Sequence, residues 1–106
     1  MAAKSKFFNK KTVIDGFKFD SQKEAAHYCY LKARQHIGQI SDLKLQVRFP
    51  LKMCDKLICH YVADFTYIEN GVLIIEDVKS AFTKKNPVYR LKKKMMLVSG
   101  YEIKEV

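Results

Sequence analysis

Two segments of the chain have the spacing of apolar residues that is typical of amphipathic helices. Ser21 precedes the first, residues 22–37, as an N-cap candidate, and Gly38 follows it as a stop. The second, residues 87–99, begins behind the capping dipeptide Asn86-Pro87. We expect each helix to bury one apolar stripe. The stripes consist of Ala26, Tyr30, Ala33 and Ile37 in the first helix and Val88, Leu91, Met95 and Val98 in the second.

Other segments have the alternation and composition of strands. Residues 40–49 place Leu43, Leu45, Val47 and Phe49 on one face, and we expect Pro50 to end this strand. Residues 57–68 and 72–79 are rich in Val, Ile, Tyr and Phe and are joined through Asn70-Gly71, a strong hairpin signal. Asp15-Gly16 predicts a further small hairpin over residues 12–19, and YEIKEV predicts a last strand.

The predicted order is hairpin, helix, three strands, helix and strand. This order indicates an α/β protein, more narrowly an α+β fold with a mixed sheet flanked by helices. A length of 106 residues fits one domain over residues 1–106, with the first ten or so residues flexible.

Composition narrows the class of protein and of partner. A hydrophobic content of 48% excludes intrinsic disorder, and the chain has no apolar stretch long enough to span a membrane. Lys and Arg number 20 against 11 Asp and Glu, a net charge of +9 that favours a polyanionic partner. The N-terminal MAAKSKFF has no apolar signal region, so we expect a cytoplasmic protein. For Cys29, Cys54 and Cys59 we expect free thiols rather than disulfides or a zinc site.

The Asn70-Gly71 turn fixes a register for the two strands that it joins. With these two residues as the loop, Asp64 faces Asp77 directly, and Lys79 follows Asp77 on the same side. Like charges in direct cross-strand pairs destabilise a sheet, so something must offset them. Two carboxylates beside an ammonium group are the parts of a divalent-cation site with a catalytic lysine. A structural ion pair is the alternative, and a longer loop would bring Glu76 toward Asp64 instead.

Three further polar residues lie near this predicted site. Glu24 is a fourth candidate, although Ser21-Gln22-Lys23-Glu24 also has the form of a helix-capping box. Glu76 should point to the opposite face from Asp77, as a surface group or a supporting contact. His60 shares the face of Asp64 by even spacing and could border the site.

Basic residues concentrate after the carboxylates and predict a surface that binds phosphates. A solvated helix face is the alternative for this run, which consists of Lys79, Lys84, Lys85, Arg90, Lys92, Lys93 and Lys94. Aromatic residues that could stack on bases are Tyr61, Tyr67, Tyr89 and Tyr101, although tyrosines in strands more often pack in a core.

Asp64 followed by Asp77-Val78-Lys79 resembles the split signature of the PD-(D/E)XK nuclease superfamily. The succession FDSQKEAAHY, ISDLKLQVRFPL, YVADFTY and IIEDVKS more closely resembles a family of small phage proteins, some of them regarded as Holliday-junction-resolvase-like. The resemblance implies a restriction-endonuclease-like core. It also implies that Glu24, Asp64 and Asp77 hold the metal, that Lys79 positions water or the scissile phosphate, and that Gln46 lies at the rim.

The sequence therefore predicts a Mg²⁺-dependent DNA endonuclease of phage type, with Mn²⁺ as a substitute, in the cytoplasm of a host cell. We expect a homodimer acting on duplex or branched DNA, because cutting two strands requires two sites. Two rival hypotheses are a non-catalytic DNA-binding module and a factor that uses its basic helix on an acidic protein.

Overall fold

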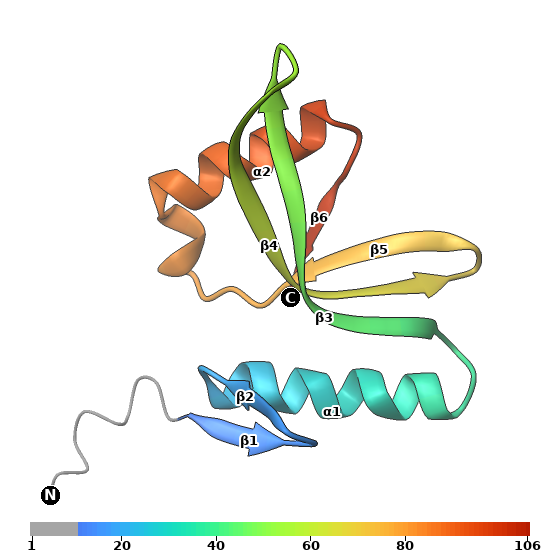
Figure 1. Ribbon diagram of the computed structural model, residues 1–106. Coiled ribbons are helices and arrows are strands. Elements are labelled where there is room, and N and C mark those ends of the chain that lie inside the picture. Colours follow the sequence, from blue (N-terminus) through green and yellow to red (C-terminus); the bar gives the residue numbers. More distant parts are fainter. Residues whose placement is uncertain (1–10) are drawn as a thin grey trace, which may run out of the picture.

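The structure, a computed structural model, describes residues 11–106 (Figure 1). The first ten residues, which were predicted to be flexible, lie outside the described part. The observed order confirms the predicted one. The elements are β1 (Thr12–Ile14), β2 (Phe17–Phe19), α1 (Gln22–His36), β3 (Ser41–Met53), β4 (Lys56–Glu69), β5 (Val72–Asp77), the 3-10 helix η2 (Thr83–Lys85), α2 (Pro87–Val98) and β6 (Ile103–Glu105).

The fold is of the predicted mixed α+β class. β1 and β2 form a separate two-stranded sheet, and the main sheet has the order β3-β4-β5-β6. The β3–β4 and β4–β5 pairs are antiparallel, whereas β5 and β6 are parallel and are connected through α2. The three-stranded meander followed by a helix and a strand is therefore present.

Left-handed backbone positions mark the hairpin turns. Asp15-Gly16 and Asn70-Gly71 both have positive φ angles, as predicted. A third turn, Cys54-Asp55, joins β3 to β4 with φ angles of 51° and 64° and was not predicted from the sequence. This turn has no glycine, so its sequence gives a weak signal.

The prediction that Pro50 ends the third strand was wrong. β3 continues to Met53, and Pro50 pairs with His60 of β4. β3 is an edge strand of the main sheet. At an edge, a residue can turn its backbone nitrogen away from the ladder, so a proline that lacks an N–H is tolerated.

Residues of β3 and β4 belong to two separate hydrophobic cores. Figure 1 shows both strands changing direction near their middle, so that one half lies near α1 and the other runs past α2 and β6. The change falls between Ala63 and Phe65 of β4, which belong to different cores. The α1 core consists of Phe19, Ala25, Tyr28, Leu31, Ile40, Phe65 and Tyr67. The α2 core consists of Leu51, Tyr61, Ala63, Ile75, Tyr89, Met96 and Ile103.

Both predicted helix stripes were largely wrong. α1 buries Ala25, Tyr28 and Leu31, while Ile37 of the predicted stripe is 67% exposed. Each helix carries a second apolar arc, offset from the predicted one, that fits the same periodicity, so spacing alone could not select the buried arc. In α2 the buried residues are Tyr89 and Met96, and Val88, Leu91 and Val98 are exposed.

Candidate metal and nucleic-acid site

Asp64 and Asp77 lie side by side where β4 changes core. The β4–β5 ladder runs from Glu69↔Val72 to Phe65↔Glu76 without a shift, so Asp64 and Asp77 are the next pair in the same register. This confirms the predicted two-residue loop and excludes the slipped register that would bring Glu76 to Asp64. The backbone N–H of Val78 donates to Asp64 Oδ2 at 2.9 Å, which fixes this carboxylate beside the end of β5.

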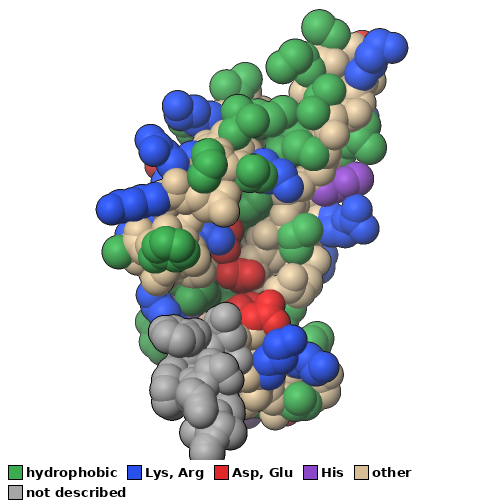
Figure 2. Space-filling view, turned by 90° about the vertical axis from the view of Figure 1, so that its left-hand side faces the viewer, with side chains coloured by type: hydrophobic (Ala, Val, Ile, Leu, Met, Phe, Trp, Pro, Cys, Tyr) green, Lys and Arg blue, Asp and Glu red, His purple; other side chains and the backbone are tan. Residues whose placement is uncertain are grey.

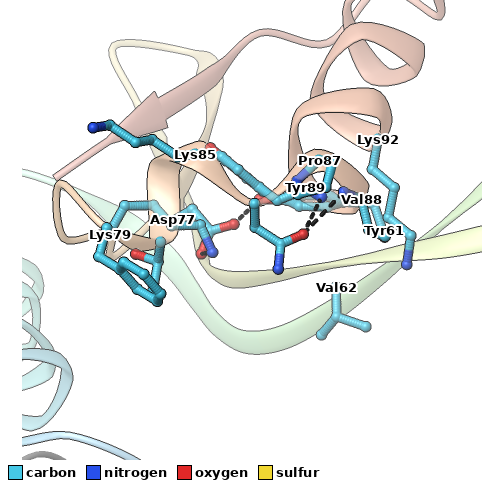
Figure 3. A pocket seen from close by; sticks show the side chains of 12 residues that line it. Tyr61, Val62, Asp77, Lys79, Lys85, Pro87, Val88, Tyr89 and Lys92 are labelled. Atoms are coloured by element: carbon cyan, nitrogen blue, oxygen red, sulfur yellow. Dashed lines mark hydrogen bonds and ion pairs between the residues drawn. The ribbon is translucent and has the colours of Figure 1, made fainter.

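Asp77 is the more buried of the two, with 3% of its surface exposed. Its Oδ2 accepts a hydrogen bond from the Tyr61 hydroxyl at 2.5 Å, and its Oδ1 lies 3.2 Å from Lys79 Nζ. The Lys79 ammonium also lies 4.2 Å from the centre of the Tyr89 ring, a cation–π contact (Figure 3). The predicted group of two aspartates and one lysine is therefore assembled.

The proximity of the two carboxyl groups changes their protonation. Burial, followed by a hydrogen bond to Asp77 and the charge of Asp77, raises the pKa of Asp64 to about 8. Burial and the same neighbour also raise the pKa of Tyr61, which keeps its hydroxyl a donor. Without a cation, the pair therefore retains one proton at neutral pH, because two adjoining charges in a poorly solvated place repel each other.

Glu24 lies close enough to Asp77 for the charge of Asp77 to affect its pKa. Burial raises the pKa of Glu24, and the charges of Asp20 and Asp77 raise it further. Only half of the capping box exists: Ser21 Oγ accepts from the Glu24 N–H at 3.1 Å, whereas the Glu24 side chain accepts from Gln46 Nε2 at 3.5 Å. The Glu24 carboxylate therefore faces the sheet, and its capping role rests on the backbone alone.

Gln46 lies near the middle of β3. Its neighbours pair as Leu45↔Phe65 and Val47↔Ala63, which places Gln46 across from Asp64. Gln46 has a φ of 54°, a left-handed conformation that is unusual for a residue with a long side chain. Such conformations persist where the surrounding structure requires them, often at functional sites. Gln46 therefore lies next to the Asp64–Asp77 pair, and its role at the rim of a metal site stays a prediction.

Glu76 and His60 lie apart from the aspartate pair. Glu76 points to the opposite side, as predicted, but it is buried rather than at the surface. There it lies 2.6 Å from His27 Nε2 of α1, and it accepts a hydrogen bond from the Tyr67 hydroxyl. Burial alone would raise the pKa of Glu76, but the bonds from His27 and Tyr67 outweigh it and the net pKa is lowered. His60 Nδ1 lies 3.2 Å from Arg48 Nη2.

The donor atoms suit a hard divalent cation. Among residues 11–106 no three His, Cys, Asp or Glu side chains are arranged to hold an ion. The predicted three-ligand set of Glu24, Asp64 and Asp77 is therefore not assembled, whereas its Asp64–Asp77 pair is. Mg²⁺ commonly takes one or two protein carboxylates and completes its shell with waters and substrate phosphates, so this pair fits Mg²⁺. The cysteines are free, as expected, and the described residues contain no zinc cluster.

A cavity of about 670 Å³ opens beside the aspartate pair (Figure 3). Figure 2 shows acidic side chains gathered in the middle of this face, with Lys and Arg side chains on both sides. We call this space the Asp77 cavity; its lining residues are Tyr61, Val62, Asp77, Lys79, Phe82, Thr83, Lys85, Asn86, Pro87, Val88, Tyr89 and Lys92.

The predicted DNA-binding residues divide into three groups. Lys85 and Lys92 line the Asp77 cavity. Lys84 and Lys93 instead lie 3.8 and 3.0 Å from the carboxylate of Glu105. Arg90 and Lys94 are exposed on α2 and line other depressions.

The exposed aromatic residue at the site is not one of the predicted tyrosines. Tyr61, Tyr67 and Tyr89 are buried, and each donates a hydrogen bond to a carboxylate, as expected for residues that pack in a core. Phe82 lines the Asp77 cavity and is 84% exposed. The sequence held a signal for it, because Phe82 is an apolar residue in an otherwise small and polar stretch between Lys79 and Lys84.

One family model matches nearly the whole chain. It covers residues 4–105 and is described as "Protein of unknown function (DUF1064)". The chain belongs to the DUF1064 family. No curated protein and no solved structure is significantly similar to this DUF1064 chain. None of its helices within residues 11–106 is long and apolar enough to cross a bilayer.

Proposed function

We propose that this DUF1064 protein is a metal-dependent DNA endonuclease of the PD-(D/E)XK type. The observation that carries the proposal is the placement of Asp64 and Asp77 in adjoining central strands, with Lys79 3.2 Å from Asp77. The order of elements around them, a helix, a three-stranded meander, a helix and a strand, agrees with the core that the sequence resemblance implies.

A purely structural ion pair explains this arrangement less well. Lys79 is one cation, whereas Asp64 and Asp77 are two carboxyl groups, and burial together with the neighbouring Asp77 raises the pKa of Asp64 to about 8. Keeping one carboxyl group protonated at neutral pH costs free energy. The pair therefore destabilises the sheet relative to two neutral residues. A bound cation would stabilise both carboxyl groups in their ionised form and so remove this cost, which gives the pair a use that an ion pair does not.

The side chains of the site suit phosphodiester hydrolysis. Asp64 and Asp77 would hold Mg²⁺ or Mn²⁺, which when bound would lower the pKa of a water molecule and neutralise phosphate charge. The Lys79 ammonium, ordered by Asp77 and the Tyr89 ring, would stabilise the charge that develops on the phosphate. The Glu24 carboxylate, held by Gln46, would orient the attacking water.

The basic residues of the cavity would position the substrate. Lys85 and Lys92 line the same space as Asp77 and would contact the phosphates next to the scissile bond. The described residues contain one pair of adjoining aspartates. Cutting both strands of duplex or branched DNA would therefore require a second copy of the chain, and we include a homodimer in the proposal.

The proposal is tested by incubating the protein with labelled duplex, branched and single-stranded DNA in Mg²⁺, Mn²⁺ or EDTA. We expect cleavage that requires the metal and is lost in Asp77→Asn and in Lys79→Met. A matched control is Lys104→Met, because Lys104 contacts Glu76 on the other side of the sheet and should leave cleavage intact. Metal-independent binding without cleavage would favour a DNA-binding module, and absence of binding would favour a protein-interaction factor.

A further inference from the structure

Phe82 is a large aromatic residue that the fold leaves outside both cores. It is 84% exposed and lies between the end of β5 and α2, where it precedes the short helix η2. It lines the same cavity as Asp77 and Lys79. A single exposed apolar residue requires no explanation by itself, so its neighbours decide whether it has a role.

The backbone around Phe82 is held by hydrogen bonds. The Ser80 N–H donates to Thr83 Oγ1 at 2.8 Å, and the Thr83 N–H donates to Ser80 Oγ at 3.1 Å. The carbonyl of Phe82 itself accepts from the Lys85 N–H at 3.1 Å. The ring is therefore presented by a loop that is already ordered, so a ligand that stacks on it would lose little conformational freedom of the chain.

The walls of the Asp77 cavity combine two kinds of chemistry. Lys85 and Lys92 provide cationic side chains, while Val62 and Val88 are 42% and 60% exposed and provide apolar surface. Asn86 Oδ1 accepts from the N–H groups of Val88 and Tyr89, so this oxygen is engaged in capping α2. A ligand that matches the cavity needs a negative charge next to a flat apolar group, and a nucleotide has both.

We propose that the Asp77 cavity takes an unpaired nucleobase of the DNA substrate, stacked on the Phe82 ring beside the scissile phosphate. The inference rests on the proposed nuclease function and specifies its substrate class. A base inside a duplex is already stacked on both faces, so only an unpaired base can place a free face on Phe82. The substrate class is therefore DNA with single-stranded nucleotides at the cleavage position, such as a flap, a gap or an open branch.

The test is a binding cycle that removes the ring and the base separately. Binding is measured by fluorescence anisotropy in EDTA, on a flap oligonucleotide and on the same flap with one abasic nucleotide at each position in turn. Removing one base stack by Phe82→Ala should weaken binding about 5- to 150-fold on the intact flap. On the flap with the matching abasic position, Phe82→Ala should change affinity less than 2-fold. Phe82→Tyr should bind like the parent.

Two controls separate stacking from general effects. Tyr30→Ala removes an exposed aromatic residue of α1 that does not line the cavity, and it should leave both affinities unchanged. A fully paired duplex should bind the parent and Phe82→Ala equally. Thermal melts check that Phe82→Ala remains folded, which we expect because the ring is 84% exposed.

The outcomes separate this inference from the proposed function. Equal loss of affinity on intact and on every abasic flap, or no loss at all, would overturn the stacking role even if the parent cleaves DNA in Mg²⁺. Specific coupling between Phe82 and one base would support the stacking role whether or not cleavage occurs. Lack of cleavage by the parent in both metals would overturn the nuclease proposal alone, and lack of DNA binding would overturn both.

Discussion

Glu76 and Asp77 are neighbours in β5 and are both almost fully buried, yet their carboxyl groups point to opposite sides of the sheet. Glu76 contacts His27 of α1, and Asp77 contacts Tyr61 and Lys79. Strand alternation thus places two acidic residues of one strand in two different environments. One belongs to the packing of α1 on the sheet, and the other belongs to the proposed site.

We expect Glu76→Gln to reduce stability without abolishing the response to metal. The change removes the negative charge that Glu76 presents to His27 and Lys104, at a cost of about 1.5–3 kcal/mol of the free energy of unfolding. Thermal melts in EDTA and in excess Mn²⁺ measure both effects. A Glu76→Gln variant that no longer shifts with Mn²⁺ would place Glu76 in the metal site.

Asp64→Asn should have the opposite effect: it should keep the stability of the protein and abolish the response to metal. Its carbonyl oxygen can still accept from the Val78 N–H, and its amide can donate to Asp77 as the protonated carboxyl does, so the cost of keeping a carboxyl group protonated at neutral pH disappears. In EDTA the variant should melt at or above the temperature of the parent. In Mn²⁺ it should lose both the thermal shift and cleavage, because a ligand is missing. A variant that melts well below the parent in EDTA would support a structural ion pair instead.

The Glu24→Gln variant distinguishes a role of Glu24 in capping α1 from a role in DNA cleavage. Ser21 caps α1 through the backbone N–H of residue 24, so the glutamine variant should keep the stability of the parent and lose cleavage. The matched control is Ser21→Ala, which removes the cap and should cost about 1 kcal/mol while leaving cleavage in place. Normal cleavage by Glu24→Gln would limit Glu24 to a structural role.

Lysines on the Asp77 cavity should matter more for DNA affinity than lysines paired with Glu105. Replacing Lys85 and Lys92 with Gln should reduce the slope of log affinity against log salt by about 2, since each phosphate contact contributes about 0.9. Replacing Lys84 and Lys93 should change the slope less, because the Glu105 carboxylate lies next to both and offsets one of their two charges. Titrations at several salt concentrations decide this, and equal slopes for the two double variants would contradict it.

Glu105 should make stability depend on pH in the acid range. Hydrogen bonding from Tyr89, and from Lys93, lowers the pKa of Glu105 below its ordinary value of 4.5 despite its partial burial. A lowered pKa in the folded state means that this stabilisation is complete above about pH 4.5 and is lost as pH falls through the folded value. The melting temperature of the parent should therefore fall more steeply between about pH 5 and pH 3 than that of Glu105→Gln. Parallel curves of melting temperature against pH for the two proteins would contradict a lowered pKa of Glu105.

Local signals predicted most of the fold. Turn dipeptides with positive φ, the caps Ser21 and Asn86, and strand alternation gave the elements and the β4–β5 register, since each depends on a few adjacent residues. The same register brought Asp64 to Asp77. The core could not be predicted in this way, because the buried arc of each helix depends on which sheet surface it meets.

The remainder of the site depends on contacts that are distant in sequence. Gln46 contacts Glu24 from a left-handed position in β3, and nothing in SDLKLQVRFP indicates that conformation. Glu105 pairs with Lys84 and Lys93 because β6 is parallel to β5 and contacts α2. Such pairings require the three-dimensional arrangement of elements.

The division of β3 and β4 between two cores has a consequence for local opening. Glu24 comes from the helix of the α1 core, whereas Tyr61 and Tyr89 belong to the α2 core. Opening of either core would therefore dismantle part of the site while the other core stays folded. In native-state hydrogen exchange, the exchange rates of the amides around Asp64 and Asp77 should match those of the core that opens more readily. The proposed site is therefore only as stable as the less stable of the two cores.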